Sequence, residues 1–302
     1  MRQEAIACDA KWACAVERSS APLPEALSAE WPAELRARFQ RDRHGVTQLV
    51  RVSHRGPLRV QRLFQTPQWA ECYLLHPPGG LVTGDSLSIA MHCAERAQVL
   101  VTTPAAGKVY GARQTAGWQR TQVNCVLEEA TGLAWLPQDT ICFDRARGHQ
   151  SIEVTVAPSA WHVGWEQITF GRRASDAPFQ SGQLRQSLCI RRGDQTIYRD
   201  QMCLTPEVLS SPVGLAGHTV MALVWYVCPV GQTVTEALDL ARDLGETAGV
   251  DSGATSVTPE LGLVRVLGDD AAQVRRYLES IWAAWTPLCV GQTVQPPRIW
   301  RT

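Results

Sequence analysis

The chain has 302 residues, of which 45% are hydrophobic, so it can bury a substantial core in one large β-rich domain or two smaller ones. Its 29 lysines and arginines are balanced by 29 aspartates and glutamates, which leaves a formal net charge of zero. A neutral chain has no overall field to attract a nucleic-acid backbone or an anionic membrane surface, so neither is expected as a partner.

The first thirty residues carry no sustained hydrophobic period and include Pro22 and Pro24, a pattern typical of a mobile leader. We therefore divide the chain into a mobile leader, residues 1–30, and a single β-rich domain, residues 31–302. The leader has no apolar segment of signal-peptide length. The most apolar later run, Val220 to Val230, is shorter than the roughly 18 residues that span a bilayer. These features predict a cytoplasmic protein.

Between Trp31 and about Leu204 the sequence consists mainly of short β-type runs separated by Gly, Pro, Asp and Asn. In one run, Ile152, Val154 and Val156 alternate with polar residues, as on a sheet with one buried face. Strands without intervening helices argue against a doubly wound parallel sheet. The expected fold class is mainly β, with many short strands in a coiled, β-helix-like or sandwich-like architecture. The runs are VTQLVRVS, PLRVQRLF, ECYLLH, SLSIAMHC, AQVLVTT, TQVNCVLEE, SIEVTVAP, HVGWEQITF, QLRQSLCIRR and QTIYRDQMCL.

Two amphipathic helices are predicted in the C-terminal half, packed on the β-core. The first begins at Thr233, where Glu236 completes a capping box, and it ends before Gly245. The second runs from about Asp270 to Trp285 and is stopped by Pro287. A single apolar stripe along the second helix is typical of a surface that faces a core. Its members are Val274, Tyr277, Leu278, Ile281, Trp282 and Trp285.

The ten cysteines are scattered, with no Cys-x-x-Cys pair and no Cys/His pair at zinc-finger spacing. We interpret most of them as buried reduced thiols, which pack like small hydrophobic residues. The seven histidines are isolated in sequence as well. Spacing alone therefore predicts no metal site.

Catalytic signatures are missing from the sequence. It has no Gly-x-Ser-x-Gly elbow and no short cysteine-protease signature. Gly107 and Lys108 do not form a phosphate-binding loop, because the preceding glycine and the following hydroxyl residue are both lacking. The residues give no support to a serine or cysteine hydrolase or to nucleotide binding.

The stretch HPPGGLVTGD, residues 76–85, combines two prolines with three glycines. The prolines favour an extended His76, while Gly79, Gly80 and Gly84 allow backbone angles that other residues avoid. This composition predicts a rigid turn in which Asp85 accepts hydrogen bonds from amides of the turn.

A metal contact at this turn stays open. The turn could bring His76 together with Asp85, or with Cys72, and Ni²⁺ accepts imidazole, carboxylate and thiolate ligands. We give less weight to any particular ligand set than to a structural role for these residues.

Two further stretches, VLVTTPAAGKVYG and GLAWLPQDTICFDRA, combine turns with polar side chains. Such side chains either line a site or satisfy buried backbone groups, and the residues alone favour the second interpretation. The polar residues are Thr102, Thr103, Lys108 and Tyr110 in the first stretch, and Gln138 and Asp139 in the second.

Five motifs occur in order along the chain: GPLRVQRLF, YLLHPPGGLVTGD, VLVTTPAAGKVYG, LAWLPQDTICFD and EQITFGRRA. As a set they resemble the urease accessory protein D family (UreD, also called UreH), from Trp31 to the closing PPRIWRT. The resemblance implies a mostly β, non-enzymatic chaperone and scaffold that binds the urease apoprotein. With urease accessory protein F and the GTPase, urease accessory protein G, it would support nickel delivery to urease. No tightly bound cofactor is implied, only transient nickel in an internal polar passage.

The resemblance also transfers a set of site residues that would line the passage or form a partner surface, none of them catalytic. Weak polar contacts suit transport, because a path must release its ion as readily as it accepts it. The residues are His76, Gly79, Gly80, Gly84, Asp85, Thr102, Thr103, Lys108, Tyr110, Gln138, Asp139, Glu166 and Arg172, and the candidate metal ligands are His76, Asp85 and Cys72.

The chain departs from the family pattern in three places. Thr83 stands where another glycine is usual, and Arg145 stands where a glycine is common. The segment RRASDAPF lacks a Gly-Glu pair that often follows the Gly-Arg motif, which argues against a metal role near Asp176.

Two other functions stay open at the level of the sequence. His76 and Asp85 beside a glycine-rich loop could belong to a metal-dependent hydrolase on a β-scaffold, which would need a tight, closed metal site. A β-rich binding module without metal is the other alternative. Nickel binding that depends on Asp85 would separate that module from a nickel chaperone.

Overall fold

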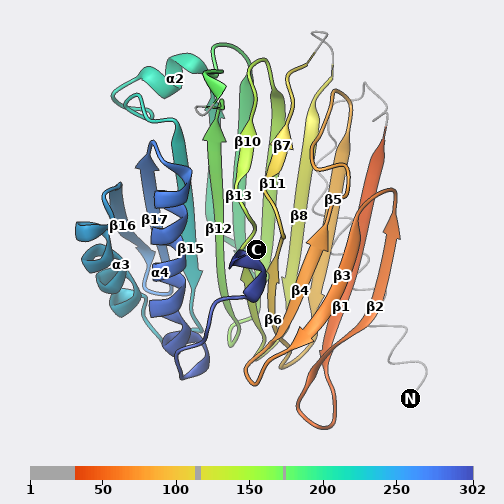
Figure 1. Ribbon diagram of the computed structural model, residues 1–302. Coiled ribbons are helices and arrows are strands. Elements are labelled where there is room, and N and C mark those ends of the chain that lie inside the picture. The colour runs from red at the N-terminus through yellow and green to blue at the C-terminus, as the bar shows by residue number, and fades with distance from the viewer. Residues whose placement is uncertain (1–30, 113–116, 173–174, 302) are drawn as a thin grey trace.

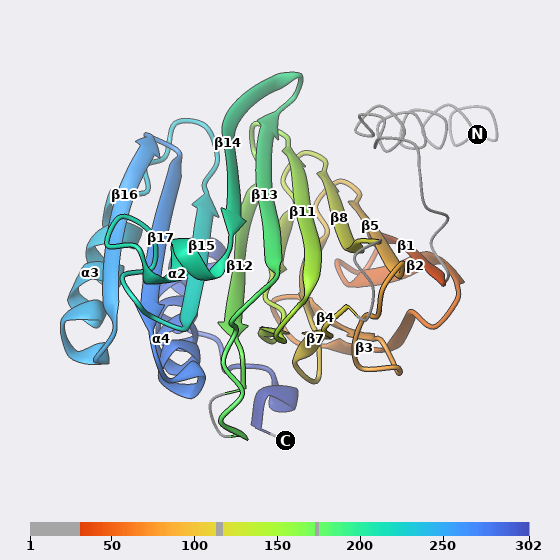
Figure 2. The same ribbon diagram turned by 90° about the horizontal axis from the view of Figure 1, so that it is seen from above.

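The computed structural model describes residues 31–112, 117–172 and 175–301. The leader predicted for residues 1–30 lies outside the described residues, and the division into a leader and one domain stays a prediction. About half of the described chain lies in two β-sheets that face each other across a hydrophobic core (Figures 1 and 2). The mainly β fold class is confirmed.

The first sheet has seven strands in the order β14-β13-β11-β8-β5-β1-β2. Its inner strands are parallel, whereas β2 and β14 pair antiparallel at the two edges. The bounds are β1 Pro32–Arg41, β2 Thr47–Arg55, β5 Ser86–Cys93, β8 Gln119–Leu127, β11 Arg147–Val156, β13 Gln183–Arg192 and β14 Gln195–Leu204.

The second sheet has ten strands, eight of them in the order β16-β17-β15-β12-β9-β6-β4-β3. Two short strands, β7 and β10, join it beside β12. The bounds are β3 Arg59–Gln65, β4 Ala70–Leu75, β6 Gln98–Thr102, β7 Gly107–Val109, β9 Gly132–Trp135, β10 Thr140–Cys142, β12 Trp161–Phe170, β15 Val220–Val227, β16 Asp251–Thr258 and β17 Leu261–Gly268.

From β4 to β13 the chain passes repeatedly from one sheet to the other. The strands β4, β6, β9 and β12 belong to the ten-stranded sheet, and β5, β8, β11 and β13 to the seven-stranded sheet. Each strand lies parallel to the strand laid down one turn earlier, for example β8 beside β5 and β9 beside β6. This is the coiled, β-helix-like arrangement expected from the sequence.

The strand runs identified in the sequence are all strands in the structure. The alternation in β11 is confirmed, because Ile152, Val154 and Val156 are buried between the sheets while the intervening residues are partly exposed. The run beginning at Val220, recognised only as apolar, is β15, and it is buried over its whole length. Strands β1, β7, β9, β10, β16 and β17, the short helix α2, Pro206–Ser210, and the turn η2, Arg298–Arg301, were not predicted.

Helices α3, Thr235–Ala248, and α4, Ala271–Val290, cover the outer face of the ten-stranded sheet over β15 to β17 (Figure 1). The predicted stripe on α4 is confirmed, because all six of its members are buried in this second core. No helix within the described ranges is both long and apolar enough to cross a membrane.

Three details of the predicted helices are wrong. Helix α3 starts after Val234, and this capping residue makes no side-chain hydrogen bond. Thr233 and Glu236 therefore form no capping box. It continues past Gly245 and ends at Gly249, whose φ of 66° is the left-handed conformation of a helix end. Pro287 lies inside the last turns of α4, which ends at a left-handed Gly291. The α4 face that packs on the sheet extends beyond the proline through Leu288 and Val290, which explains why the helix continues.

Gly164 in β12 allows the ring of Trp225 on β15 to lie across the strand. A Cβ at position 164 would lie 2.2 Å from Cζ2 of Trp225, a side chain that is fully buried. The Trp225 ring forms part of the wall between the two sheets, so the absence of a side chain at Gly164 shapes the interior.

We expect Gly164→Ala to lower the free energy of unfolding by about 1–3 kcal/mol, because the added methyl group has to displace a packed ring. Chemical denaturation of the purified chain would measure the change. Gly253→Ala in β16 is the matched control, since a Cβ there meets no atom within 4 Å. Equal denaturation midpoints for the two variants would contradict the prediction.

Candidate functional site

The loop between β4 and β5 is held in one conformation by its own hydrogen bonds. The Val82 N–H donates to Asp85 Oδ2 over 2.9 Å, and the Asp85 N–H donates to the Val82 carbonyl over 3.1 Å. Gly79 and Gly84 have φ angles of 71° and 90°, which are open mainly to glycine. Asp85 itself is 8% exposed. The predicted rigid turn, with Asp85 accepting a turn amide, is confirmed.

This loop is joined to the two other loops singled out in the sequence. The Leu81 N–H donates to the Lys108 carbonyl, and the Tyr110 N–H donates to the Leu81 carbonyl, so the first loop pairs with β7. Strand β7 pairs with β10, and the Gln138 N–H donates to Thr103 Oγ1 over 2.9 Å. The three loops, which follow the C-terminal ends of β4, β6 and β9, thus form one hydrogen-bonded layer.

Gly80 permits a close contact between the first loop and β7. A Cβ at Gly80 would lie 2.5 Å from Cε2 of Tyr110 and 2.9 Å from Cβ of Lys108. Any other residue would push the first loop away from β7. The Nζ of Lys108 lies beside the neighbouring Gly79, 3.9 Å from where a Cβ would be.

A cavity of about 390 Å³ lies between the two sheets behind these loops. Its walls come from β5, β8 and β11 on one side and from β4, β9 and β12 on the other. Most of the lining is apolar, including Leu74, Ile89, Val123 and Trp135. The residues predicted from the sequence that line it are His76, Gly79, Gly80, Thr103, Lys108, Gln138 and Glu166.

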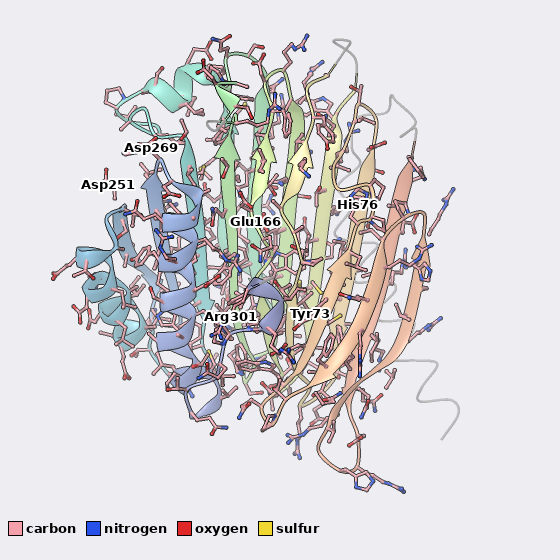
Figure 3. All side chains as sticks on the ribbon, viewed as in Figure 1. Tyr73, His76, Glu166, Asp251, Asp269 and Arg301 are labelled. Atoms are coloured by element: carbon pink, nitrogen blue, oxygen red, sulfur yellow. The ribbon has the colours of Figure 1, made fainter. Side chains whose placement is uncertain are left out.

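Glu166 lies at the inner end of this cavity, in the middle of β12 and near the centre of the molecule (Figure 3). It is enclosed by protein, and its remaining accessible surface faces the internal space. Burial raises the pKa of its carboxyl group to about 7, and a 3.0 Å hydrogen bond donated by Trp135 Nε1 opposes this shift. At neutral pH the carboxylic acid and the carboxylate are therefore both populated.

His76 lies at the end of β4, beside the glycine-rich loop (Figure 3). Partial burial lowers the pKa of its imidazole, and the nearby carboxylate of Asp85 opposes this effect. The imidazole is thus neutral at pH 7, the form that can accept a metal ion. Cys72, the third candidate ligand, is fully buried in the apolar core between the sheets, where burial raises the pKa of its thiol to about 12.

Three other predicted residues have structural contacts outside the cavity. Thr102 is fully buried, donates from Oγ1 to the Leu136 carbonyl, and accepts a hydrogen bond from Trp300 Nε1 over 2.9 Å. Asp139 accepts a hydrogen bond from Thr169 Oγ1, and burial raises the pKa of its carboxyl group. Gly84 belongs to the turn rather than to the cavity wall.

Tyr110 and Arg172 lie in a second, open hollow of about 1030 Å³ next to the first loop. The Tyr110 ring packs edge-on against Phe143, and the guanidinium of Arg172 lies 4.8 Å from the centre of the same ring. Arg145 has a φ of 64° and lies in the wall of this hollow. The thirteen predicted residues therefore do not form one site, but divide between the cavity, the hollow and supporting contacts.

No group of three or more His, Cys, Asp or Glu side chains converges on a metal-sized site within residues 31–112, 117–172 and 175–301. The hydrolase alternative needs such a closed set of ligands, so it gains no support from these residues. Of the candidate ligands only His76 lines the cavity, and it lies apart from Glu166, a predicted passage residue, along the same cavity.

Sequence reasoning missed Gln150 in β11 and Gln186 in β13, which are 8% and 7% exposed. Both point between the sheets, in the same alternating phase as the buried Ile152 and Leu188. A glutamine in the buried phase of an alternating strand is the signal that could have identified them.

The raised pKa of Glu166 predicts how folding stability depends on pH. Between about pH 4.5 and pH 7 the unfolded chain releases the Glu166 proton first, so stability falls as the pH rises. Above pH 7 this loss in the free energy of unfolding is complete and amounts to about 3 kcal/mol. We expect Glu166→Gln to remove this loss, so that the variant gains stability over the wild type from pH 5 to pH 8.

Denaturation at both pH values would measure that gain. Glu246→Gln, on the exposed surface of α3, is the control and should show no such change. A Glu166→Gln variant whose stability difference from the wild type is the same at both pH values would contradict the assignment.

Comparisons with known protein sequences identify the family of this chain. The sequence profile of the family described as "UreD urease accessory protein" matches residues 32–301. A urease accessory protein UreD from Saccharophagus degradans is 36% identical over 94% of this chain and 97% of its own length. The UreD protein of Chromohalobacter salexigens is 35% identical over 90% of this chain and 89% of its own length. The UreD protein of Marinobacter nauticus is 38% identical over 88% of this chain and 90% of its own length. This chain therefore belongs to the UreD urease accessory protein family.

Proposed function

We propose that this chain is a non-enzymatic chaperone and scaffold for urease maturation. It binds the urease apoprotein and, together with urease accessory proteins F and G, supports nickel delivery to the urease active site in the cytoplasm. Membership of the UreD family across nearly all of the described chain is the observation that carries this proposal. The relatives that match are named as accessory proteins, which favours a non-enzymatic role.

Nickel passes through the cavity between the sheets as a transient cargo. The cavity has a donor group at each end, the neutral imidazole of His76 near the loop and the carboxyl group of Glu166 in the interior. Apolar walls between them offer the ion no further strong ligand. A path with separated, incomplete ligand sets binds an ion weakly enough to release it again.

Lys108 fits the same role. Its side chain lines the cavity and its ammonium group lies beside Gly79, near the His76 end. A fixed positive charge there weakens the binding of a divalent cation and favours its onward movement. The open hollow around Tyr110 and Arg172 is a separate surface, available to a partner protein.

Urease activation in cells that lack the gene tests this function. The wild-type chain should restore urease activity and co-purify with the urease apoprotein and accessory proteins F and G. Asp85→Ala removes the acceptor for the Val82 amide, so the first loop loses its fixed shape. We expect Asp85→Ala to reduce activation several-fold, whereas Asp85→Asn, which keeps an acceptor oxygen, should retain more activity.

Asp194→Ala, at the exposed turn between β13 and β14, is the matched control and should restore full activity. Lys108→Ala tests the positive charge, and we expect slower activation with the complex still formed. Failure of the wild-type chain to bind the urease apoprotein or accessory protein F would rule out the scaffold role.

A further inference from the structure

Beyond Glu166 the interior narrows to a space of about 10 Å³, which is room for a single water molecule or ion. This space shares Ile152 and Glu166 with the large cavity, so the two adjoin at Glu166. Its other polar lining residues are Gln186, Ser187 and Asp200. The constriction therefore leads from the cavity towards β14, the edge strand of the seven-stranded sheet.

Two glutamines from neighbouring strands lie at this constriction. Gln150 lines the cavity and Gln186 lines the narrow space, and the two are direct partners in the register of β11 and β13. Each is more than nine-tenths buried, and neither Oε1 has a hydrogen-bond partner in the described part of the chain. Gln150 Nε2 donates to Thr140 Oγ1 over 3.1 Å, which fixes the orientation of that side chain.

An unpartnered buried amide oxygen is costly, because it gives up its hydrogen bonds to water without a replacement. Two of them side by side, next to a carboxyl group on the facing sheet, indicate a place that a polar guest occupies. All three side chains can present oxygen, and only one of them can carry a negative charge. This set favours a cation over an anion and binds it weakly.

Asp200 lies at the outer end of the narrow space. Its Oδ2 accepts hydrogen bonds from Tyr198 over 2.9 Å and from Arg265 Nη2 over 3.1 Å. Because Arg265 belongs to β17 and Asp200 to β14, this ion pair joins the two sheets where the constriction reaches the edge. A cation that arrives there meets the Asp200 carboxylate, whose charge is already balanced by Arg265. The carboxylate therefore binds the cation less tightly and does not retain it.

We propose that Glu166, Gln150 and Gln186 form a single-file relay site for a divalent cation, through which it leaves the large cavity towards Asp200 on β14. This inference rests on the proposed transit of nickel and names the point that controls it. The relay differs from a storage site because two of its three ligands are neutral amides. The ion exchanges its water shell for these oxygens one ligand at a time.

Fluorine NMR of the full chain labelled with fluorotryptophan tests the relay with Ni²⁺ alone. Trp135 lines the cavity beside Glu166 and Trp225 lines the narrow space, so paramagnetic Ni²⁺ in the relay should broaden both signals. Trp→Phe substitutions assign the two signals, and the exposed Trp31 serves as a reference. The double variant Gln150→Met, Gln186→Met keeps the side-chain length, and we expect it to need at least about tenfold more Ni²⁺ for the same broadening.

Gln167→Met is the matched control. Gln167 is 2% exposed and also has an unpartnered Oε1, but it lies on the opposite face of β12, where its Nε2 donates to Ala271. It should respond to Ni²⁺ like the wild type. If the double variant does not fold, the single variants are each expected to need about threefold more Ni²⁺.

Two results would overturn the relay: an unchanged Ni²⁺ dependence in the glutamine variants, or a wild-type Trp225 signal that Ni²⁺ does not affect. The glutamines would then only form hydrogen bonds to internal water. Urease activation in cells separates this failure from that of the proposed function. Variants that form the complex but activate about tenfold more slowly support the relay. A wild-type chain that does not activate urease overturns the proposed function, while the NMR result still decides whether the cation enters.

Discussion

Two facing sheets have to fill the space between them with side chains from every second position of each strand, and this packing constraint determines where an internal space can exist. Large apolar residues such as Phe39, Met91 and Leu133 close the gap over much of the interface. Strands β7 and β10 are only three residues long, and the loop between β4 and β5 that pairs with β7 is rich in glycine. The interior there stays partly empty, and the 390 Å³ cavity is the result.

The polar groups in this interior are expensive to bury, which makes their position informative. A carboxyl group that keeps its proton to about pH 7 and two amide oxygens without partners among the described residues reduce the stability of the fold. The carboxyl group and both amide oxygens lie where the large cavity meets the constriction. Trp225, packed on Gly164, forms part of the wall of the constriction. Unfavourable groups gathered at one point of a largely apolar core are typical of a functional position.

Local chemistry made much of the fold predictable. The alternation in β11, the apolar stripe on α4 and the Asp85 turn depend on residues close together in sequence, and all three are confirmed. The family resemblance supplied the function class, which periodicity could not. The helix ends were predicted less well, because tertiary packing carries α4 past Pro287. Arg145 has a left-handed φ of 64°, a backbone conformation better suited to glycine.

The site was only partly predictable, because a motif does not show which face of a strand each residue occupies. Thr102 and Thr103 are neighbours in sequence, yet Thr103 lines the cavity while Thr102 is bonded to Trp300 on the outer face. Sequence reasoning also could not show that β11 and β13 pair in the register that places Gln150 beside Gln186. That pairing joins strands more than thirty positions apart and is fixed by the coil as a whole.

Residues on the outer face can support the cavity without touching it. The Pro137 carbonyl accepts hydrogen bonds from Trp165 Nε1 and Arg275 Nη1, both over 2.8 Å, and Pro137 itself lines the cavity. The guanidinium of Arg275 packs against both Trp165 and Trp300, 4.8 and 4.6 Å from the centres of their rings. The C-terminal turn η2, Arg298–Arg301, thereby fixes the corner before Gln138 from outside (Figure 1). The motif around Gln138 and Asp139 therefore combines one residue that faces the cavity with others that hold the cavity wall in place.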